Sequence, residues 1–286
     1  MTIKTVFLLP VAFASVASAQ IWVSAATGSD TNLCTRTAPC KTFQKAVNVA
    51  PVWSQVTVLD AGDYGPVTIS QSVTIDGAGL ATNVATSGSA IFVQAGSGIV
   101  QLRNLSIHGN GAQYGINLQN AGQMVIENVK VNGFGNTCIS AAIGTGTDLV
   151  IKDSSVDNCS VGGIAILGSG TGTVEITNTH VHYVNQGMQV TGGNVTVSGS
   201  SFSGLSQTNA NPGILAEGNV MLDNCQISSF GYAIENIGGS VQMSRSTISS
   251  SGVALYTANG TTTSNGNNSF FNNSQNGSFT KTVALQ

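Results

Sequence analysis

The sequence predicts an all-β protein, a three-sided parallel β-helix of about eight to nine coils closed by a short N-terminal helix. Two short sequence patterns recur at a nearly constant period over most of the chain. The composition agrees, because only 7% of the residues are charged and 35 glycines stand among many Ile, Val, Ser, Thr and Asn residues. Such a balance suits short strands joined by tight turns rather than a disordered chain.

The first pattern is apolar-x-polar-x-x-apolar. Its copies begin at Ile75 (a divergent one), Leu102, Ile126, Ile151, Ile176, Val197, Leu222 and Met243. Successive copies start 21 to 27 residues apart, which is the spacing of stacked solenoid coils.

The second pattern, Gly-apolar-x-apolar, occurs once in each period, for example at Gly115–Leu118, Gly163–Ile166 and Gly187–Val190. Each coil therefore holds three short apolar stretches with a period of two, which predicts three strands. Equivalent strands of neighbouring coils pair, so inward positions form ladders of like residues. One predicted ladder contains Ile107, Val131, Val156, Val181, Phe202, Ile227 and Ile248.

The polar residue of the first pattern is expected in a tight turn between two strands. It is Asn104, Asn128, Asp153, Asn178 and Asn224 in five coils, and Gly199 in another. Asn, Asp and Gly tolerate the left-handed backbone conformation that such a turn needs. These residues are therefore predicted to be structural and not catalytic.

The chain divides into four predicted parts. Residues 1–19 read as a signal peptide, with Lys4, an apolar run and a small-x-small end at Ala17–Ala19, which predicts a secreted, periplasmic or cell-envelope protein. Residues 20–68 form a head and cap, in which Thr42–Val49 is an amphipathic helix halted by Pro51. Residues 69–263 form the coils. Residues 264–286, rich in Asn, Ser and Gly, are either a final polar coil or a frayed tail.

Five cysteines allow two disulfides at most. Cys34 and Cys40 close a short loop in the head and are the best candidates for one bridge. Cys138, Cys159 and Cys225 fall inside the coils, where we expect buried small residues, with a Cys138–Cys159 bridge as the alternative.

The head carries a more specific pattern. Residues 22–32 read WVSAATGSDTN and residues 34–43 read CTRTAPCKTF. This head resembles the opening of exported bacterial right-handed parallel β-helix repeat proteins of the pectin-lyase-like superfamily. The resemblance implies a right-handed helix with three parallel sheets, an Asn-containing turn between the second and third sheets, and a long variable turn after the third. It implies a fold and not an activity, because this fold carries many functions.

Charge and composition exclude several classes of partner. The net charge of −3 with scattered Lys and Arg disfavours nucleic-acid binding. After the signal peptide no apolar run is long enough to span a membrane. No Cys, His or carboxylate spacing suggests a metal, and no cofactor motif is present, so no cofactor is expected. We also expect a monomer.

Polyuronide-cleaving members of that superfamily usually carry their site on the outer face of the first sheet, with acidic calcium ligands and a basic residue, or with paired aspartates. The predicted outward positions of that sheet are Phe92, Asn117, Ser140, Ala165, Gln189, Leu215, Glu235 and Ala254. One carboxylate is not a catalytic pair, so the sequence does not predict an enzyme. The long polar turn from Ser203 to Pro212 adds no acid, base or histidine.

Two groups of charged or titratable residues remain. Arg103, Glu127 and Lys152 fall at equivalent outward positions and predict an exposed ion-pair ladder. His180, His182 and Tyr183, with Asp157 one coil earlier, form the candidate binding patch, and Lys130 is expected on the same side.

A non-catalytic protein that binds a polysaccharide or a cell-surface glycan, or serves in the envelope, is the preferred function. A polysaccharide lyase or glycoside hydrolase is the alternative. Aromatic platforms for sugar rings are sparse, since the candidates appear scattered in the sequence: Tyr64, Phe92, Tyr114, Tyr183, Tyr232 and Tyr256.

Overall fold

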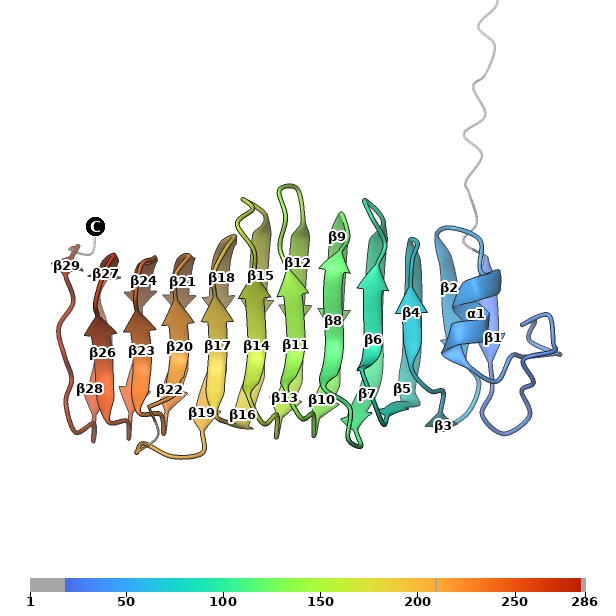
Figure 1. Ribbon diagram of the computed structural model, residues 1–286, viewed down its shortest axis with the longest axis horizontal. Helices are drawn as coiled ribbons and strands as arrows, with labels where there is room; N and C mark the ends of the chain where they lie inside the picture. Colours follow the sequence, from blue (N-terminus) through green and yellow to red (C-terminus); the bar gives the residue numbers. More distant parts are fainter. Residues whose placement is uncertain (1–18, 209, 284–286) are drawn as a thin grey trace, which may run out of the picture.

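The protein is a rod of stacked β coils, a right-handed parallel β-helix with one short helix in the described part of the chain (Figure 1). The structure is a computed structural model, and it describes residues 19–208 and 210–283. The predicted signal peptide, residues 1–19, lies outside these residues except for Ala19. No helix among the described residues is long and apolar enough to cross a membrane.

Three parallel sheets run the length of the rod, and we number them in the order in which the chain visits them within a coil. The first sheet contains β4 (Val67–Ile69), β6 (Ser89–Gln94), β8 (Tyr114–Asn120), β11 (Thr137–Ala142), β14 (Gly162–Leu167), β17 (Gln186–Val190), β20 (Pro212–Ala216), β23 (Tyr232–Asn236) and β26 (Val253–Thr257). Its strands face the viewer in Figure 1.

The second sheet contains β1 (Gln20–Val23), β2 (Ser54–Val58), β9 (Gln123–Glu127), β12 (Asp148–Lys152), β15 (Thr173–Thr177), β18 (Asn194–Ser198), β21 (Asn219–Asp223), β24 (Ser240–Ser244), β27 (Thr261–Ser264) and β29 (Lys281–Thr282). The third contains β3 (Gly62–Asp63), β10 (Lys130–Asn132), β13 (Ser155–Asp157), β16 (His180–Val184), β19 (Ser201–Gly204), β22 (Gln226–Ser228), β25 (Thr247–Ser249) and β28 (Ser269–Phe271). Two long strands, β5 (Val73–Ala85) and β7 (Ile99–Gly109), belong to both the second and the third sheet.

The predicted core ladder is confirmed. Ile107 pairs with Val131, and the register continues through every predicted member to Ile248. All seven side chains are buried. The repeat therefore fixed the register, since a slip of one residue would turn each of these side chains to solvent.

The predicted left-handed turn is also confirmed. The backbone φ is 55° at Asn104, 46° at Asn178 and 57° at Gly199. Arg245 takes the same conformation in the turn between β24 and β25, with a φ of 49°. A second left-handed position follows the third sheet and was not predicted; it is occupied by Asn158, Tyr183, Ser229, Ser250 and Asn272.

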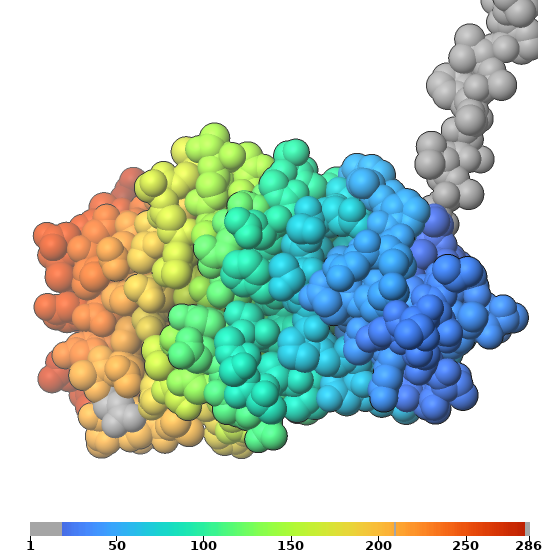
Figure 2. Space-filling view, turned by 45° about the vertical axis from the view of Figure 1, so that its right-hand side comes forward, coloured from blue at the N-terminus to red at the C-terminus, as the bar shows by residue number. Residues whose placement is uncertain are grey.

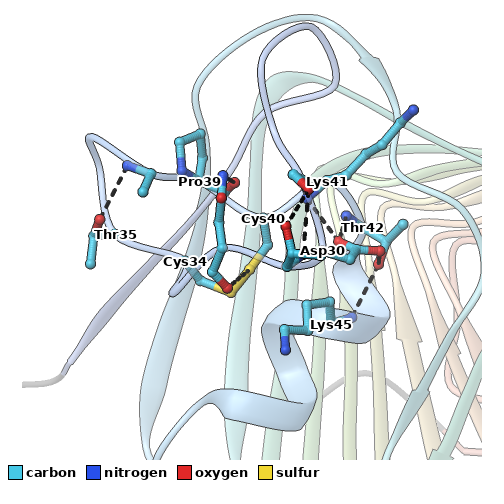
Figure 3. The surroundings of a disulfide bond; sticks show 12 residues. Asp30, Cys34, Thr35, Pro39, Cys40, Lys41, Thr42 and Lys45 are labelled. Atoms are coloured by element: carbon cyan, nitrogen blue, oxygen red, sulfur yellow. Dashed lines mark hydrogen bonds between the residues drawn. A yellow bond between two sulfur atoms is a disulfide. The ribbon is translucent and has the colours of Figure 1, made fainter.

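The N-terminal end of the rod is covered by the head and by α1 (Phe43–Val49) (Figure 2). The helix buries Phe43, Ala46 and Val47. The Thr42 hydroxyl caps the helix by accepting a hydrogen bond from the Lys45 amide at 3.1 Å. The predicted Cys34–Cys40 disulfide is present (Figure 3). Beside it, Asp30 accepts hydrogen bonds from the Lys41 and Thr42 amides at 2.9 and 3.0 Å.

A second carboxylate organises the first coil. Asp60 accepts hydrogen bonds from the Ser24 hydroxyl, from the Ala25 amide at 2.7 Å and from the Tyr64 hydroxyl at 2.8 Å. Burial alone would raise the pKa of Asp60, but these hydrogen bonds lower it below its usual value. Burial and the Asp60 carboxylate raise the pKa of Tyr64 to about 12.

Of the three cysteines in the coils, two form the disulfide that was the alternative prediction and one is a buried residue. Cys138 and Cys159 form the second disulfide, between the first sheet and the turn after β13. Cys225 is a buried free thiol, and burial raises its pKa. The C-terminal segment adds a further coil to the β-helix, because β28 pairs with β25 and β29 pairs with β27.

Candidate functional site

The predicted histidine patch lies on the third sheet. His180 and His182 both contact the Ser201 hydroxyl of the next coil, His180 through Nδ1 at 2.8 Å and His182 through Nε2 at 3.0 Å. Their ring centroids are 5.7 Å apart, and the Tyr183 ring stands edge-on to His182 at 6.4 Å. One serine thus joins the two imidazoles.

The fourth residue of the patch, Asp157, lies close to His182 without a hydrogen bond to it. Asp157 is the register neighbour of His182, yet no hydrogen bond joins their side chains among the described residues. Lys130 lies two coils from His180 in the same row, and both line a depression of about 200 Å³ beside the asparagine turns. Imidazoles held by a hydroxyl on an open surface suit polar contact better than acid–base chemistry.

The outer face of the first sheet requires one correction. The register places Phe92, Asn117, Ser140, Ala165, Gln189, Leu215 and Glu235 in one row, as predicted. The row ends at Tyr256, whereas the predicted Ala254 is fully buried. In β26 the position of the pattern's glycine is occupied by Ala254, and Gly252 lies two residues earlier, so the count from Gly252 went wrong by two residues.

The aromatic residues are less scattered than the sequence suggested. The ring centroids of Tyr232 and Tyr256 lie 5.4 Å apart on the outer face of the first sheet. Glu235, the register neighbour of Tyr256, lies beside them, and burial raises the pKa of its carboxyl group. Tyr64 is not an exposed platform as predicted, because it is buried in the head and stacks on Phe43 at 4.9 Å.

A feature on the outer face of the second sheet was not predicted. Three depressions of about 430, 360 and 550 Å³ follow one another along the outer face of the second sheet. Thr196 lines all three, and we call this row of depressions the second-sheet groove. The strands that form it, such as β18, β21 and β24, lie behind the first sheet in Figure 1.

The second-sheet groove is lined by uncharged polar and apolar side chains, with a few charged ones. Its first row is a ladder of amide, hydroxyl and carboxylate side chains: Gln123, Asp148, Thr173, Asn194, Asn219 and Ser240. The Asn219 amide donates to the Asn194 side-chain oxygen at 3.0 Å. Met221, which is 44% exposed, supplies an apolar surface in the floor. The sequence signal for this groove is the row of short polar residues that appears when the outward positions of the second sheet are aligned coil by coil.

Two carboxylates, Asp148 and Glu175, line the first depression, and further charged groups lie near the two ends of the groove. The predicted ion-pair ladder is present, with Glu127 at 3.2 Å from Arg103 and at 2.9 Å from Lys152. At the other end Arg245 pairs with Asp223, and this hydrogen bond lowers the pKa of Asp223. No cluster of metal-ligating residues occurs within residues 19–208 and 210–283.

Comparison with known proteins agrees with this architecture. The family model described as right handed beta helix region matches residues 48–202, which excludes most of the head. None of the curated proteins compared with the sequence matches it.

Two solved structures share the fold at low sequence identity. Tailspike protein 2 from Escherichia coli O157:H7 bacteriophage CAB120 is 13% identical with a TM-score of 0.60, and the match covers 90% of this chain and 39% of the tailspike. The GH136 lacto-N-biosidase from Eubacterium ramulus is 11% identical with a TM-score of 0.58, and the match covers 94% of this chain and 67% of that enzyme. The chain thus spans well under half of the tailspike's length.

Proposed function

Because the chain belongs to the right-handed β-helix family, we propose that it binds a polysaccharide or cell-surface glycan along the second-sheet groove. The observation that carries this proposal is that three neighbouring depressions along the second sheet share Thr196 in their lining. Clefts with a few convergent polar groups are the usual form of a ligand site.

The spacing of the groove suits a polymer rather than a small molecule. Successive coils stand about 4.8 Å apart, so a chain lying along the rod meets an equivalent side chain at every coil. Amide and hydroxyl groups such as Asn194 and Asn219 both donate and accept hydrogen bonds, as sugar hydroxyls do. The apolar face of a sugar ring can rest on Met221 between them.

The experiment blocks the middle of the groove. Thr196→Trp places a large side chain in the lining that the three depressions share, and it should lower the affinity for a bound glycan by at least about tenfold. Thr74→Trp is the matched control, because Thr74 occupies the same outward row near the N-terminus, outside the groove. Equal affinities of the two variants on a glycan array would reject the groove.

The histidine patch is proposed as an additional contact. Its depression adjoins the asparagine turns that separate the second and third sheets, so a branch of the glycan could reach His180 from the groove. His180→Ala should then weaken a branched ligand about threefold and leave a linear one unchanged.

Catalysis by a lyase or hydrolase is the second candidate, and Glu235 is the observation that favours it. A carboxyl group with a raised pKa suits a general acid. Glycoside hydrolysis uses two carboxyl groups, however, and the register neighbours of Glu235 are Leu215 and Tyr256. Product release from neutral and uronate polymers, abolished by Glu235→Gln, would establish the enzyme and replace the binding proposal.

We also propose that the protein is exported and acts as a monomer. The two disulfides support an oxidising compartment, where such bonds persist. The N-terminal residue of the protein recovered from the extracellular or periplasmic fraction should be Gln20, and its mass in solution should be that of a single chain.

A further inference from the structure

We propose that Tyr232, Glu235 and Tyr256 form a separate binding site for an uncharged sugar ring on the first sheet. The two tyrosine rings are tilted by 53° to each other with centroids 5.4 Å apart. Tyr256 is 44% exposed, and Tyr232 is half-buried. The pair therefore offers an aromatic surface to solvent on a rigid strand framework.

The chemistry of the occupant follows from Glu235. Its carboxyl group is half-buried beside Tyr256, and it has neither a hydrogen-bond partner nor an ion-pair partner among the described residues. A purely apolar partner would bury this group without a donor, which is unfavourable. A sugar ring supplies hydroxyl donors for the carboxyl group and an apolar C–H face for the tyrosines.

The charge of the site selects among sugars. No Lys or Arg follows Lys152 in the sequence until Arg245 and Lys281, and the first-sheet neighbours of Glu235 are uncharged. A uronate or sialic acid would place its carboxylate near Glu235 without a compensating cation. The site therefore favours neutral sugars, and it differs in this from sites that bind polyuronides through cations.

The long turn before β20 borders the site. Its Gln207 backbone lies next to Gly252, so the turn reaches across the coils that contain Tyr232 and Val253. In Figure 1 this turn runs from β19 along the rod towards the C-terminal end.

The site is independent of the second-sheet groove, because it lies on a different sheet and shares no residue with it. Either proposal can fail while the other stands. If both hold, a long glycan or two glycans could be bound by two faces of one rod, which raises the overall avidity.

Ring-labelled tyrosine observed by NMR tests the proposal with the full chain, which has five tyrosines. The probes are cellohexaose, xylohexaose, maltohexaose, N-acetylchitohexaose and hexagalacturonate. We expect at least one neutral probe to shift the Tyr232 and Tyr256 signals and to saturate them, with no shift from hexagalacturonate. Thr196→Trp should leave these shifts unchanged.

Substitutions then assign the binding. Tyr256→Ala should lower the affinity about tenfold, and Glu235→Ala should lower it more than Glu235→Gln, which keeps a hydrogen-bonding group. Phe271→Ala is the matched control, since Phe271 is an exposed aromatic residue on β28, away from every proposed contact. The proposal would be overturned if no neutral probe shifted the two signals, or if Tyr256→Ala bound as tightly as the unsubstituted chain. It would also be overturned if glucosamine oligomers bound and their N-acetylated forms did not, because this preference would indicate a site for cations.

Discussion

The two ends of the rod solve the same problem with different chemistry. Any solenoid exposes strand edges and an apolar interior at its ends. The N-terminal end uses α1, a disulfide and two carboxylates, Asp30 and Asp60, which accept hydrogen bonds from the head. The C-terminal end uses neutral amides and two aromatic rings, and no Asp or Glu occurs in the sequence after Glu235.

At the C-terminal end asparagines take over a task that hydroxyls perform in the coils. The Ser246 hydroxyl accepts from the Cys225 amide at 3.0 Å and donates to the Ser244 carbonyl at 2.7 Å. One coil later Asn268 accepts from the Ser246 amide at 3.0 Å and donates to the Met243 carbonyl at 2.9 Å. Phe270 and Phe279 pack edge-on beneath, with ring centroids 5.7 Å apart. The difference between the ends predicts that they fail under different conditions.

Acidification should separate the ends most strongly. Burial alone would raise the pKa of Asp30 and of Asp60, but hydrogen bonds lower both below the usual value of 3.8. A lowered pKa in the folded state contributes stability above the unfolded-state pKa, and this contribution is lost as the pH falls through the folded-state value. Below about pH 4 the head should therefore open while the C-terminal coils persist.

Hydrogen exchange at each end, corrected for the intrinsic effect of pH, measures this difference. Equal loss of protection at both ends would show that the carboxylates do not distinguish them.

Asp60→Ala should destabilise the head by about 3 kcal/mol, the largest loss expected from any one substitution at either end. It removes the carboxylate that accepts hydrogen bonds from the Ala25 amide and from the buried Ser24 and Tyr64 hydroxyls. Both tryptophans, Trp22 and Trp53, lie in the head, so urea unfolding followed by tryptophan fluorescence reports this end and circular dichroism reports the coils.

The control for this substitution is Glu217→Ala, which removes an exposed carboxylate from a turn and should change stability by less than about 0.5 kcal/mol. A fluorescence transition that moves together with the circular dichroism signal would mean that the head is not a separate unit.

Asn268→Ala should destabilise the C-terminal end by about 2 kcal/mol, since it removes both an acceptor and a donor of the last coil. Asn268→Asp keeps the acceptor and loses the donor, so its effect should be intermediate above pH 5. Amide exchange of Ser246 is the measurement. Protection of Ser246 that is equal in both variants would contradict the capping role.

The sequence repeat predicted the features that recur in every coil, namely the buried ladder and the left-handed turn. The core ladder ending at Ile248 and the left-handed turn at Asn104 follow from sterics that act on every coil alike. Surface sites do not repeat in this way. Tyr232 and Tyr256 lie 24 residues apart, and their contact depends on the orientation of two side chains rather than on a spacing.

The second-sheet groove escaped prediction for a related reason. Amide and hydroxyl residues are the ordinary choice at outward strand positions, so Asn194 and Asn219 taken singly carry no signal of a site. The hollow in the surface arises from the short side chains along several neighbouring strands together, and only the structure shows it.

The smallest expected change in stability comes from removing the charge of Glu127, in the middle of the rod. Glu127 makes two ion pairs, with Arg103 and Lys152, but the three side chains are between 29% and 40% exposed. Exposed pairs contribute well under about 1 kcal/mol, and salt screens them. Glu127→Gln should therefore change the free energy of unfolding by less than about 0.5 kcal/mol, measured by urea unfolding followed by circular dichroism at low and high salt.

A loss near that expected for Asp60→Ala would contradict this argument. Both carboxylates have two or more partners, yet only Asp60 satisfies hydroxyl groups that are themselves removed from water. A carboxylate in this fold should thus stabilise it in proportion to the buried donors that depend on it, and not to the number of opposite charges within reach.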